Sequence, residues 1–391
     1  MTMYFVGIDI SKYKHDCCII SAANQKVVSK FTFKNDKSGF EQLNLILNSL
    51  STPEDIKIGF ESTAHYALNL ELFLENAHHS FMEVNPVLIK EYKKSTTLRR
   101  TKTDSVDCES IARWLITVEY KPHSKGFYHA YSLKSLTRLR DRLIRQRSFY
   151  LVKITNVLDH TFPEFKPFFN ERLSKTALYL LENYGSAEKM ARMNSASYDK
   201  LRCISRGKFS IQQFLRLKEL AANTVGVNNS IFDLELNTLL TLYKSLSDEI
   251  NTLETEIIKL IEEVHPHYMS IPGIGPISAA VIYAEYGDIS NFSNPGQMLA
   301  FAGIEPGIND SGTESHGGRM VKHGSSQLRY VLLNACLPLI RFDLTFATYY
   351  EKKRAEGKKH RVAITHVAKK LIRVIYALER QDVDFNAQKL R

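Results

Sequence analysis

Residues 4–11 of the chain read Tyr4-Phe5-Val6-Gly7-Ile8-Asp9-Ile10-Ser11, an apolar stretch interrupted by one glycine and one carboxylate. Such a run is typical of a buried central strand with a single polar group near its end. Burying a carboxylate without a partner is costly, so we expect Asp9 to meet a cation, a hydrogen-bond donor or a metal ion. The simpler alternative is an aspartate that caps a turn at the strand end.

The composition indicates a multi-domain, nucleic-acid-binding protein. The chain has 391 residues, of which 44% are hydrophobic, enough for two or three separate cores. Lys and Arg number 52 against 42 Asp and Glu, a net charge of +10 that favours nucleic acid as a partner. The five cysteines form no C-x-x-C pair, and no apolar run approaches the length of a membrane helix. We therefore expect a soluble, cytoplasmic protein without a membrane partner.

Residues 1–125 predict a mixed sheet with helices. Strands at residues 16–21 and 27–33 follow the first strand as an antiparallel meander, and a helix then leads to a strand at residues 56–61. This order places Asp9 and Glu61 at the ends of two strands, where carboxylates can point into a common crevice.

A second pair of carboxylates begins a helix at residues 101–115. Asp104 and Asp107 are three residues apart, on one helix face, although the helix dipole alone also favours acidic residues in a first turn. Together with Asp9 and Glu61 they form a set of hard oxygen ligands suited to Mg²⁺ or Mn²⁺. In phosphodiester chemistry such ions activate the attacking oxygen and stabilise the leaving oxygen. The set therefore indicates a metal-dependent nuclease.

Three of these segments, Gly7–Lys12, Phe60–Thr63 and Lys102–Asp107, resemble the DEDD-type transposases of insertion-sequence family one-hundred-and-ten. The first domain of that family is similar to the RuvC Holliday-junction resolvase, and the resemblance covers nearly the whole chain. It implies a ribonuclease-H-like fold, in which the catalytic, Mg²⁺-binding tetrad would be Asp9, Glu61, Asp104 and Asp107.

Residues 126–265 predict a region of long helices. A first helix combines a leucine stripe with clustered arginines, and it ends at Thr161-Phe162-Pro163. The arginines either lie along phosphates or form the solvated face of a packed helix. In a second helix, leucines recur every seven residues from Leu239 to Leu260, the heptad pattern of a coiled coil. Its partner is either the arginine-rich helix of the same chain or the same helix of a second subunit.

Residues 266–391 predict a mostly helical domain, so the fold class is α/β plus all-α. Gly273 and Gly275 belong to a helix-hairpin-helix-like pattern, in which a tight turn presents backbone N–H groups to a DNA phosphate. A glycine-rich turn between helices, without a ligand, is the alternative.

The segment 310–329 is polar and glycine-rich, which predicts a loop before a helix that starts at Leu328. A serine becomes a nucleophile only beside a base, a metal or a cationic cluster, and by itself a Ser-Gly pair is more often a turn. The cations of this segment that can contact phosphate or stabilise its transition state include Arg319, Lys322 and Arg329.

In the transposases that this chain resembles, a Ser-Gly pair, a Lys-Arg-Gly-Asn-like turn and Leu-Arg mark a segment whose serine forms a phosphoserine link to DNA. Ser311-Gly312 and Leu328-Arg329 match this pattern, so Ser311 is the implied nucleophile and nearby Ser315 the alternative. The turn at residues 322–325 departs from the pattern at two positions. The resemblance further implies DNA ends and target as substrates, a guide RNA, a dimer or tetramer, and a bacterial or archaeal nucleoid location.

Three other functions remain open. A hydrolytic junction resolvase would use the carboxylates and a water molecule without a serine. An actin-like sugar kinase or ATPase also begins with a Gly-x-Asp strand, but the later glycine-rich phosphate loops are missing from the sequence. A DNA-binding regulator without enzymatic activity would have no use for the carboxylates.

Overall fold

The computed structural model describes residues 3–61, 66–84, 86–96, 104–122, 127–170, 173–311, 314–320, 322 and 324–390, without the side chains of residues 104–106, 306–319 and a few others. The chain forms two compact units, Met1–Tyr128 and His129–Arg391. The first combines a sheet with helices and the second is mostly helical, which confirms the predicted class of fold. The finer division at residues 125 and 265 stays a prediction.

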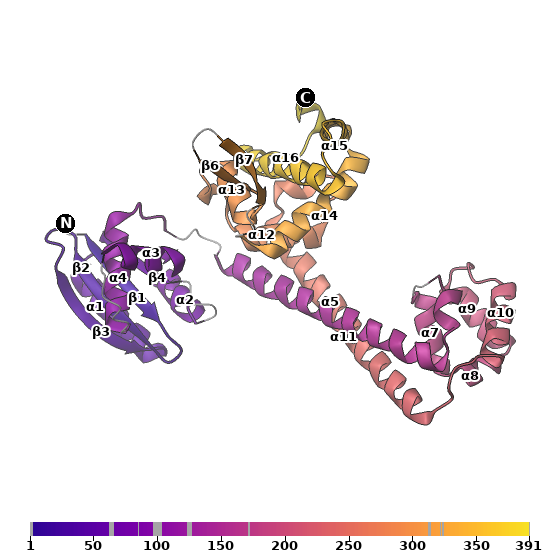
Figure 1. The fold of residues 1–391 in the computed structure, drawn as a ribbon. Coiled ribbons are helices and arrows are strands. Elements are labelled where there is room, and N and C mark those ends of the chain that lie inside the picture. Colours follow the sequence, from indigo (N-terminus) through magenta and orange to yellow (C-terminus); the bar gives the residue numbers. More distant parts are fainter. Residues whose placement is uncertain are drawn as a thin grey trace. The chain divides into compact units, whose positions relative to one another are not determined.

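A mixed sheet of five strands forms the centre of the first unit (Figure 1). β1, β2 and β3 are an antiparallel meander, β4 is parallel to β1 and β5 to β4, and the order is β3-β2-β1-β4-β5. The predicted mixed sheet is therefore confirmed. The strands are Tyr4–Ile10 (β1), Lys14–Ser21 (β2), Val27–Lys34 (β3), Ile56–Glu61 (β4) and Phe81–Val84 (β5).

Helices cover both faces of this sheet. Val6 and Ile8 of β1 share a core with α1 and α2, whereas Phe5 packs with α3 and α4. This alternation follows from the period of two along a strand. Consequently, the odd-numbered residues of β1 face α3 and α4. The helices are Lys37–Leu50 (α1), Leu68–Asn76 (α2), Pro86–Thr96 (α3) and Asp104–Thr117 (α4).

Helix α4 lies directly on the centre of the sheet because β1 and β4 carry glycines where it crosses them. A Cβ atom at Gly7 would lie 2.2 Å from the carbonyl oxygen of Cys108 and 2.4 Å from the amide nitrogen of Ala112. At Gly59 it would lie 2.8 Å from a methyl carbon of Leu115. Glycine thus permits an approach between strand and helix that no other residue allows.

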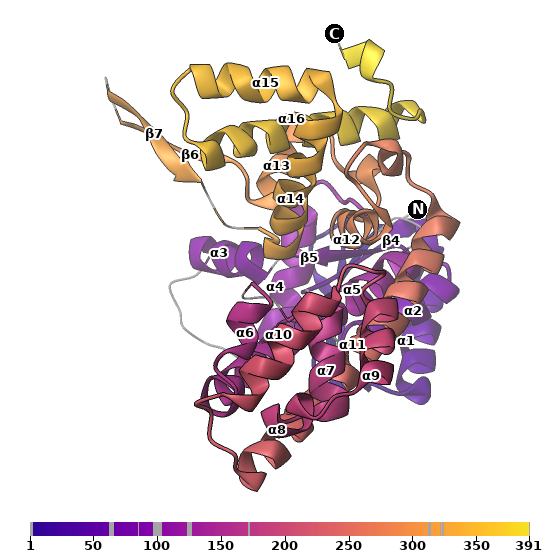
Figure 2. The ribbon, with the colours of Figure 1, turned by 90° about the vertical axis from the view of Figure 1, so that its right-hand side faces the viewer.

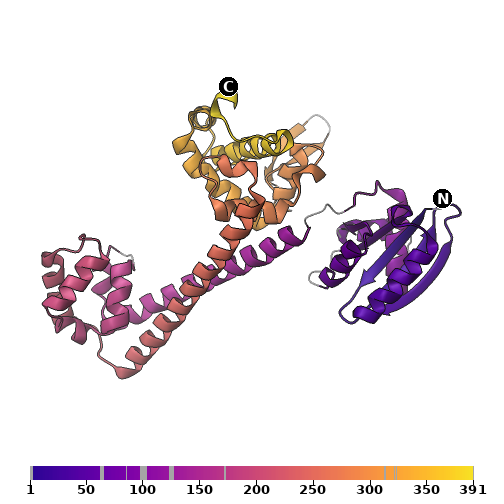
Figure 3. The ribbon, with the colours of Figure 1, turned by 180° about the vertical axis from the view of Figure 1, so that it is seen from behind.

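Two helices of 35 residues each, α5 (Phe127–Thr161) and α11 (Ser230–Val264), run through the second unit (Figure 3). Near one end Leu133 packs in a common core with Ile257, and near the other Ile154 shares a core with Leu236. The partner of α11 is thus the arginine-rich helix of the same chain, one of the two alternatives predicted. Coiled-coil winding and pairing with a second subunit stay predictions.

Five shorter helices join α5 to α11. They pack around the C-terminal part of α5 and the N-terminal part of α11. Four of them begin with a serine or asparagine whose side chain accepts a hydrogen bond from the first turn, the usual N-cap. They are Phe165–Phe168 (α6), Lys175–Tyr184 (α7), Ala187–Ala191 (α8), Ser195–Ile204 (α9) and Ile211–Ala222 (α10).

The C-terminal helices form a core into which the base of α5, its N-terminal part, and the C-terminal part of α11 also pack. A two-stranded hairpin projects from this core (Figure 2). The elements are Pro276–Tyr286 (α12), Pro295–Ala302 (α13), Pro306–Ser311 (β6), Glu314–Met320 (β7), Ser326–Phe342 (α14), Leu344–Ala355 (α15) and His360–Gln381 (α16), with single 3₁₀ turns at Pro53–Asp55, His267–Ser270, Ile289–Asn291 and Ala387–Leu390.

None of the helices in the described part of the chain is by itself long and apolar enough to cross a membrane. The pair α14 and α15 meets the criteria of length and composition only when joined across a bend of 106°.

Candidate active site

Two of the predicted carboxylates lie at neighbouring strand ends. β1 and β4 are parallel, and Ile8 and Phe60 are their last paired residues. Asp9 and Glu61 come next on the two strands, and both are half-buried. Each stands two residues beyond the glycine that contacts α4, so both carboxylates point to the face of the sheet that α4 covers. The structure thus brings the two acids to the same end and the same face of the sheet.

Helix α4 supplies the second pair. Asp104 is its first residue, and Asp107 lies one residue before Cys108, whose carbonyl oxygen packs against Gly7. Asp107 and Asp9 each lie within two residues of this crossing point. All four predicted ligands therefore stand on elements in contact with one another. The side chain of Asp104 lies outside the described residues, and its role stays a prediction.

A further carboxylate adjoins this site. Asp16 of β2 is directly opposite Asp9 in the antiparallel register, and side chains of such pairs stand about 5 Å apart on one face. Asp16 accepts a hydrogen bond from Thr32 at 2.6 Å and lies 3.9 Å from the Nζ atom of Lys14. Asp16 was not predicted as a site residue, although the register of the first hairpin would have revealed it.

The carboxylate of Asp107 has a lysine partner. Lys93, in the last turn of α3, donates a hydrogen bond from Nζ to Oδ1 at 2.7 Å. The two side chains are 28% and 18% exposed, so water screens this pair less than an ordinary surface pair. Lys93 was also missed, because no periodicity or motif connects it with the acidic residues.

The donor set of this site suits a hard divalent cation. Asp9, Glu61 and Asp107 offer carboxylate oxygens, which Mg²⁺ and Mn²⁺ prefer. Among the side chains that the structure describes, no three His, Cys, Asp or Glu groups are gathered closely enough to hold an ion. Asp107 instead faces Lys93. The chemistry of the residues therefore fits Mg²⁺ or Mn²⁺, and their joint coordination of an ion is a prediction.

The candidate nucleophile lies near the tip of the β6–β7 hairpin. Ser311 ends β6 and pairs with Glu314, and Ser315 of β7 pairs with Asp310. The sequence predicted an open loop here, but the two strands satisfy each other's backbone groups. Neither serine side chain is among those described, so the choice of Ser311 over Ser315 stays a prediction.

The basic residues that follow have different surroundings. Lys322 is exposed. Arg329 is half-buried and donates a hydrogen bond from Nη1 to the carbonyl oxygen of Ala302, 3.2 Å away at the end of α13. The guanidinium group thereby supplies a hydrogen bond to a carbonyl oxygen that has no partner within its own helix, because the helix ends there. Arg329 thus has a structural role besides its predicted phosphate contact, and the side chain of Arg319 lies outside the described part.

The two glycines of the predicted phosphate-binding turn also differ. Gly273 has a φ of +97°, and a Cβ atom there would lie 2.8 Å from Cγ of Pro338 and 3.1 Å from the carbonyl oxygen of Ala335. Close packing against α14 therefore accounts for Gly273 without a ligand. Gly275 is the exposed N-cap of α12 with open space around it. A phosphate contact at either glycine stays a prediction.

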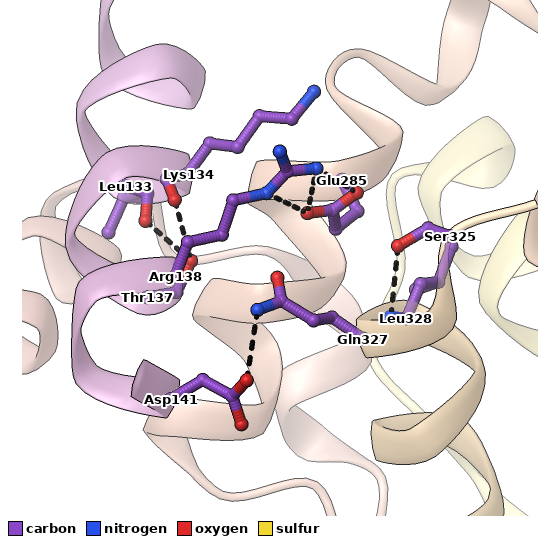
Figure 4. A network of polar contacts seen from close by, with 9 residues as sticks. All are labelled: Leu133, Lys134, Thr137, Arg138, Asp141, Glu285, Ser325, Gln327 and Leu328. Carbon is purple, nitrogen blue, oxygen red and sulfur yellow. Dashed lines mark hydrogen bonds and ion pairs between the residues drawn. The ribbon is translucent and has the colours of Figure 1, made fainter. Parts of the chain in front are cut away.

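A polar network connects the base of α5 with α12 and α14 (Figure 4). Arg138 forms two hydrogen bonds with Glu285 of α12, Nε to Oε1 at 3.0 Å and Nη2 to Oε2 at 3.3 Å. One turn further along α5, Asp141 accepts a hydrogen bond from Gln327 at 3.4 Å. Ser325 caps α14 next to this contact. The network thus fixes the start of the helix that follows the serine-bearing hairpin.

The same contacts modify the prediction for the arginine-rich helix. Arg138 and Arg140 are paired with glutamates of α12 and α11, the second at 2.7 Å from Glu254. Arg145 pairs within α5 with Asp141. Ion pairs inside the unit therefore account for several of the arginines predicted to contact phosphates.

These features define a protein of two units, an α/β unit with an acidic site and a helical unit with a serine-bearing hairpin next to basic residues. A family model described as "Transposase" matches residues 6–163, and one described as "Transposase IS116/IS110/IS902 family" matches residues 266–351. The chain belongs to this family of transposases.

Curated relatives agree with this assignment. The chain is 25% identical to the 42 kDa protein of insertion element IS900 from Mycobacterium paratuberculosis, over 96% of this chain and 95% of that protein. It is 23% identical to the pilin gene-inverting protein of Moraxella bovis, over 99% and 98%. The match to the 43.6 kDa protein of insertion element IS110 from Streptomyces coelicolor is 27% identical and spans 60% of either chain.

Proposed function

We propose that this protein is a transposase or site-specific recombinase that cuts and rejoins DNA strands of an insertion element. The observation that carries the proposal is the position of Asp9 and Glu61 at adjacent ends of parallel strands, beneath the helix that bears Asp107. The family models support it, as does the relative named for inverting a pilin gene.

The proposal assigns the first unit a ribonuclease-H-like, RuvC-like fold. Three antiparallel strands followed by two parallel strands, with acids at the ends of β1 and β4 and on a helix laid across them, support this assignment. The division into domains 1–125, 126–265 and 266–391 belongs to the same proposal.

Asp9, Glu61, Asp104 and Asp107 form the proposed carboxylate site. When bound there, one or two Mg²⁺ or Mn²⁺ ions would activate an attacking oxygen and stabilise the leaving oxygen of a phosphodiester. The role of the protein would be to hold these metal ligands in place. Asp9 and Glu61 are held by the rigid sheet, and Gly7 lets α4 approach closely enough to present its own acids.

The proposed nucleophile is the Oγ atom of Ser311, with Ser315 as the alternative. It would form a bond to the phosphorus and give up its proton, while the bond from phosphorus to the 3′ oxygen breaks and that oxygen takes a proton. A 3′ hydroxyl of the partner strand would reverse these steps and release the serine. Cations stabilise the charge on the phosphate in both steps, a role proposed for Arg319, Lys322 and Arg329.

The proposed partners are DNA, a guide RNA and further copies of the chain. A helix-hairpin-helix-like contact at Gly273 and Gly275 would bind the DNA backbone, and the guide RNA follows from the family likeness alone. Self-association through the long helices as a dimer or tetramer is supported by exposed apolar side chains on α5 and α11. These are Leu139, Phe149, Val152, Ile231, Leu234 and Leu242. The proposed place of action is the bacterial or archaeal nucleoid.

The test uses DNA that carries the ends of the element, incubated with a guide RNA transcribed from the flank of the element, Mg²⁺ and the wild type, Ser311→Ala or Ser315→Ala. We expect the wild type and Ser315→Ala to form a covalent adduct, whose digestion yields a phosphoserine peptide containing residue 311. Ser311→Ala should form none. A junction resolvase would instead cleave without an adduct and be unaffected by Ser311→Ala. Lack of any metal-dependent cleavage would contradict the enzymatic function itself.

A further inference from the structure

We propose that Lys93 is the internal counter-ion of the carboxylate site. Its ammonium group binds Asp107 in the absence of a divalent cation and is displaced when the metal binds. This inference rests on the proposed function, since it takes the carboxylates to be metal ligands. It adds a residue and a control step that the acidic motif does not include.

The geometry of the pair formed by Lys93 and Asp107 supports this role. The Nζ atom of Lys93 lies 2.7 Å from Oδ1 of Asp107. The backbone of Lys93 is held in place, because its helix α3 shares with α4 a core that includes Ile89 and Ile111. The next residue offers a contrast, since Lys94 pairs with Glu91 of its own helix and both side chains are 60% exposed. Lys93 therefore forms a shielded contact between two helices, and Lys94 an ordinary surface pair.

The concentration of negative charge at the site also calls for a counter-ion. Asp9 and Asp16 are directly opposite each other, Glu61 stands at the next strand end, and Asp107 adjoins the point where α4 crosses β1. Like charges in a partly buried place repel strongly unless a cation lies among them. Lys93 provides such a cation from within the chain. The acids can thus lie close together in the fold before any metal arrives.

Lys93 and a metal ion would compete for the carboxylate of Asp107. A divalent cation binds a carboxylate oxygen at about 2.1 Å, and an ammonium group on the same carboxylate would place two cations close together. The flexible stem of lysine lets its head group move away. Once released, the ammonium can pair with an incoming phosphate. DNA and metal would therefore favour each other's binding, as linkage requires.

The test measures the affinity of full-length protein for Mn²⁺ by calorimetry, together with the melting temperature with and without the ion. We expect Lys93→Met to bind Mn²⁺ at least about threefold more tightly than the wild type, as expected when a neighbouring positive charge is removed. Its melting temperature without metal should fall, and saturating Mn²⁺ should restore it. Lys93→Gln should behave alike, because it also lacks the charge.

Two matched variants serve as controls. Lys94→Met removes a lysine from the same turn of α3 and should leave both measurements at wild-type values. Lys93→Arg keeps the charge and should not bind Mn²⁺ more tightly than the wild type. Asp107→Asn should bind Mn²⁺ more weakly, which identifies the site that the titration reports.

The outcomes separate this inference from the proposed function. If the wild type binds Mn²⁺ through Asp107 but Lys93→Met and Lys93→Gln bind it equally or less tightly, Lys93 merely orients the carboxylate and our inference is wrong. If the wild type binds no Mn²⁺, or Asp107→Asn binds it equally well, the metal site itself is wrong and the inference with it.

Discussion

Glu71 of α2 is a buried acid on the face of the sheet away from α4, and it makes the stability of the first unit depend on pH. Its side chain is 1% exposed. Burial raises the pKa of Glu71 from 4.5 to about 9, and a hydrogen bond with Glu83 of β5 contributes in the same direction. The folded protein thus keeps a proton that the unfolded chain loses above pH 4.5. Stability must therefore fall as the pH rises toward 9.

We predict that Glu71→Gln weakens this dependence. The amide stays neutral and can still donate a hydrogen bond to Glu83, so the melting temperature should fall less between pH 5 and pH 9, the interval set by the shift in pKa. The difference from the wild type at pH 9 should be at least about 2 °C. Circular dichroism melting curves across this range provide the measurement. Glu41→Gln, which replaces an exposed acid on α1, is the control. If the melting temperatures of Glu71→Gln and the wild type changed with pH in the same way, the prediction would be wrong.

At the level of single residues, the sequence identified acids but not their partners. Asp9 and Glu61 could be predicted because each follows an apolar run that ends a strand. Lys93 could not, since its position depends on how α3 packs on α4, which no local pattern determines. Asp16 needed one step more than a local pattern, the register of β1 against β2, which places it opposite Asp9.

Among the elements, α4 depends most on a single position of the sheet. Replacing Gly7 by alanine would place a Cβ atom 2.2 Å from a backbone oxygen of α4, which a change of side-chain rotamer cannot relieve. We predict that Gly7→Ala destabilises the first unit by about 1–3 kcal/mol, the usual cost of overpacking. Because the strand or the helix must shift, the affinity for Mn²⁺ should fall as well.

Denaturant unfolding followed by circular dichroism, together with Mn²⁺ titration, measures both effects. Gly275→Ala is the matched control, since Gly275 has an ordinary φ of −79° and open space around it. Its free energy of unfolding should change by less than about 0.5 kcal/mol. Equal stability of Gly7→Ala and the wild type would mean that α4 does not lie against β1 as the structure has it.

Elements with a strong period were predictable and those made by pairing were not. The long helices α5 and α11 follow from their apolar spacing and from the proline that comes after Thr161. The hairpin of β6 and β7 was predicted as a loop, because its glycines and polar residues carry no alternation. Its strands form through pairing with each other, which propensity alone does not reveal.

At the scale of the molecule, the sequence left two partners open for α11, and its two ends share cores with one of them, α5 of the same chain. A heptad pattern states that a helix has an apolar seam but not which helix covers it. Leu133 and Ile154 of α5 pack into cores with opposite ends of α11. The base of the pair is thereby part of the C-terminal core, a long-range arrangement that local spacing does not encode.

The ion pair of Arg138 with Glu285 tests this arrangement, since it ties the base of α5 to the C-terminal core. The Glu285 side chain is 2% exposed, and Arg138→Met would leave its carboxylate buried without its guanidinium. We predict a loss of about 1–3 kcal/mol in the stability of the second unit. Glu285→Met combined with Arg138→Met should recover part of it, because no unpaired charge then remains. Arg192→Met, which removes a surface pair with Glu188, should cost less than about 1 kcal/mol.

The same variant shows whether the two units behave independently. The Mn²⁺ affinity of Arg138→Met should equal that of the wild type, because the proposed carboxylate site lies wholly in the first unit, Met1–Tyr128. Denaturant unfolding and Mn²⁺ titration of one preparation provide both values. A change in Mn²⁺ affinity without a change in stability would show instead that α5 transmits the state of the C-terminal core to the acidic site. The two units would then act as one energetic system, although each has its own core.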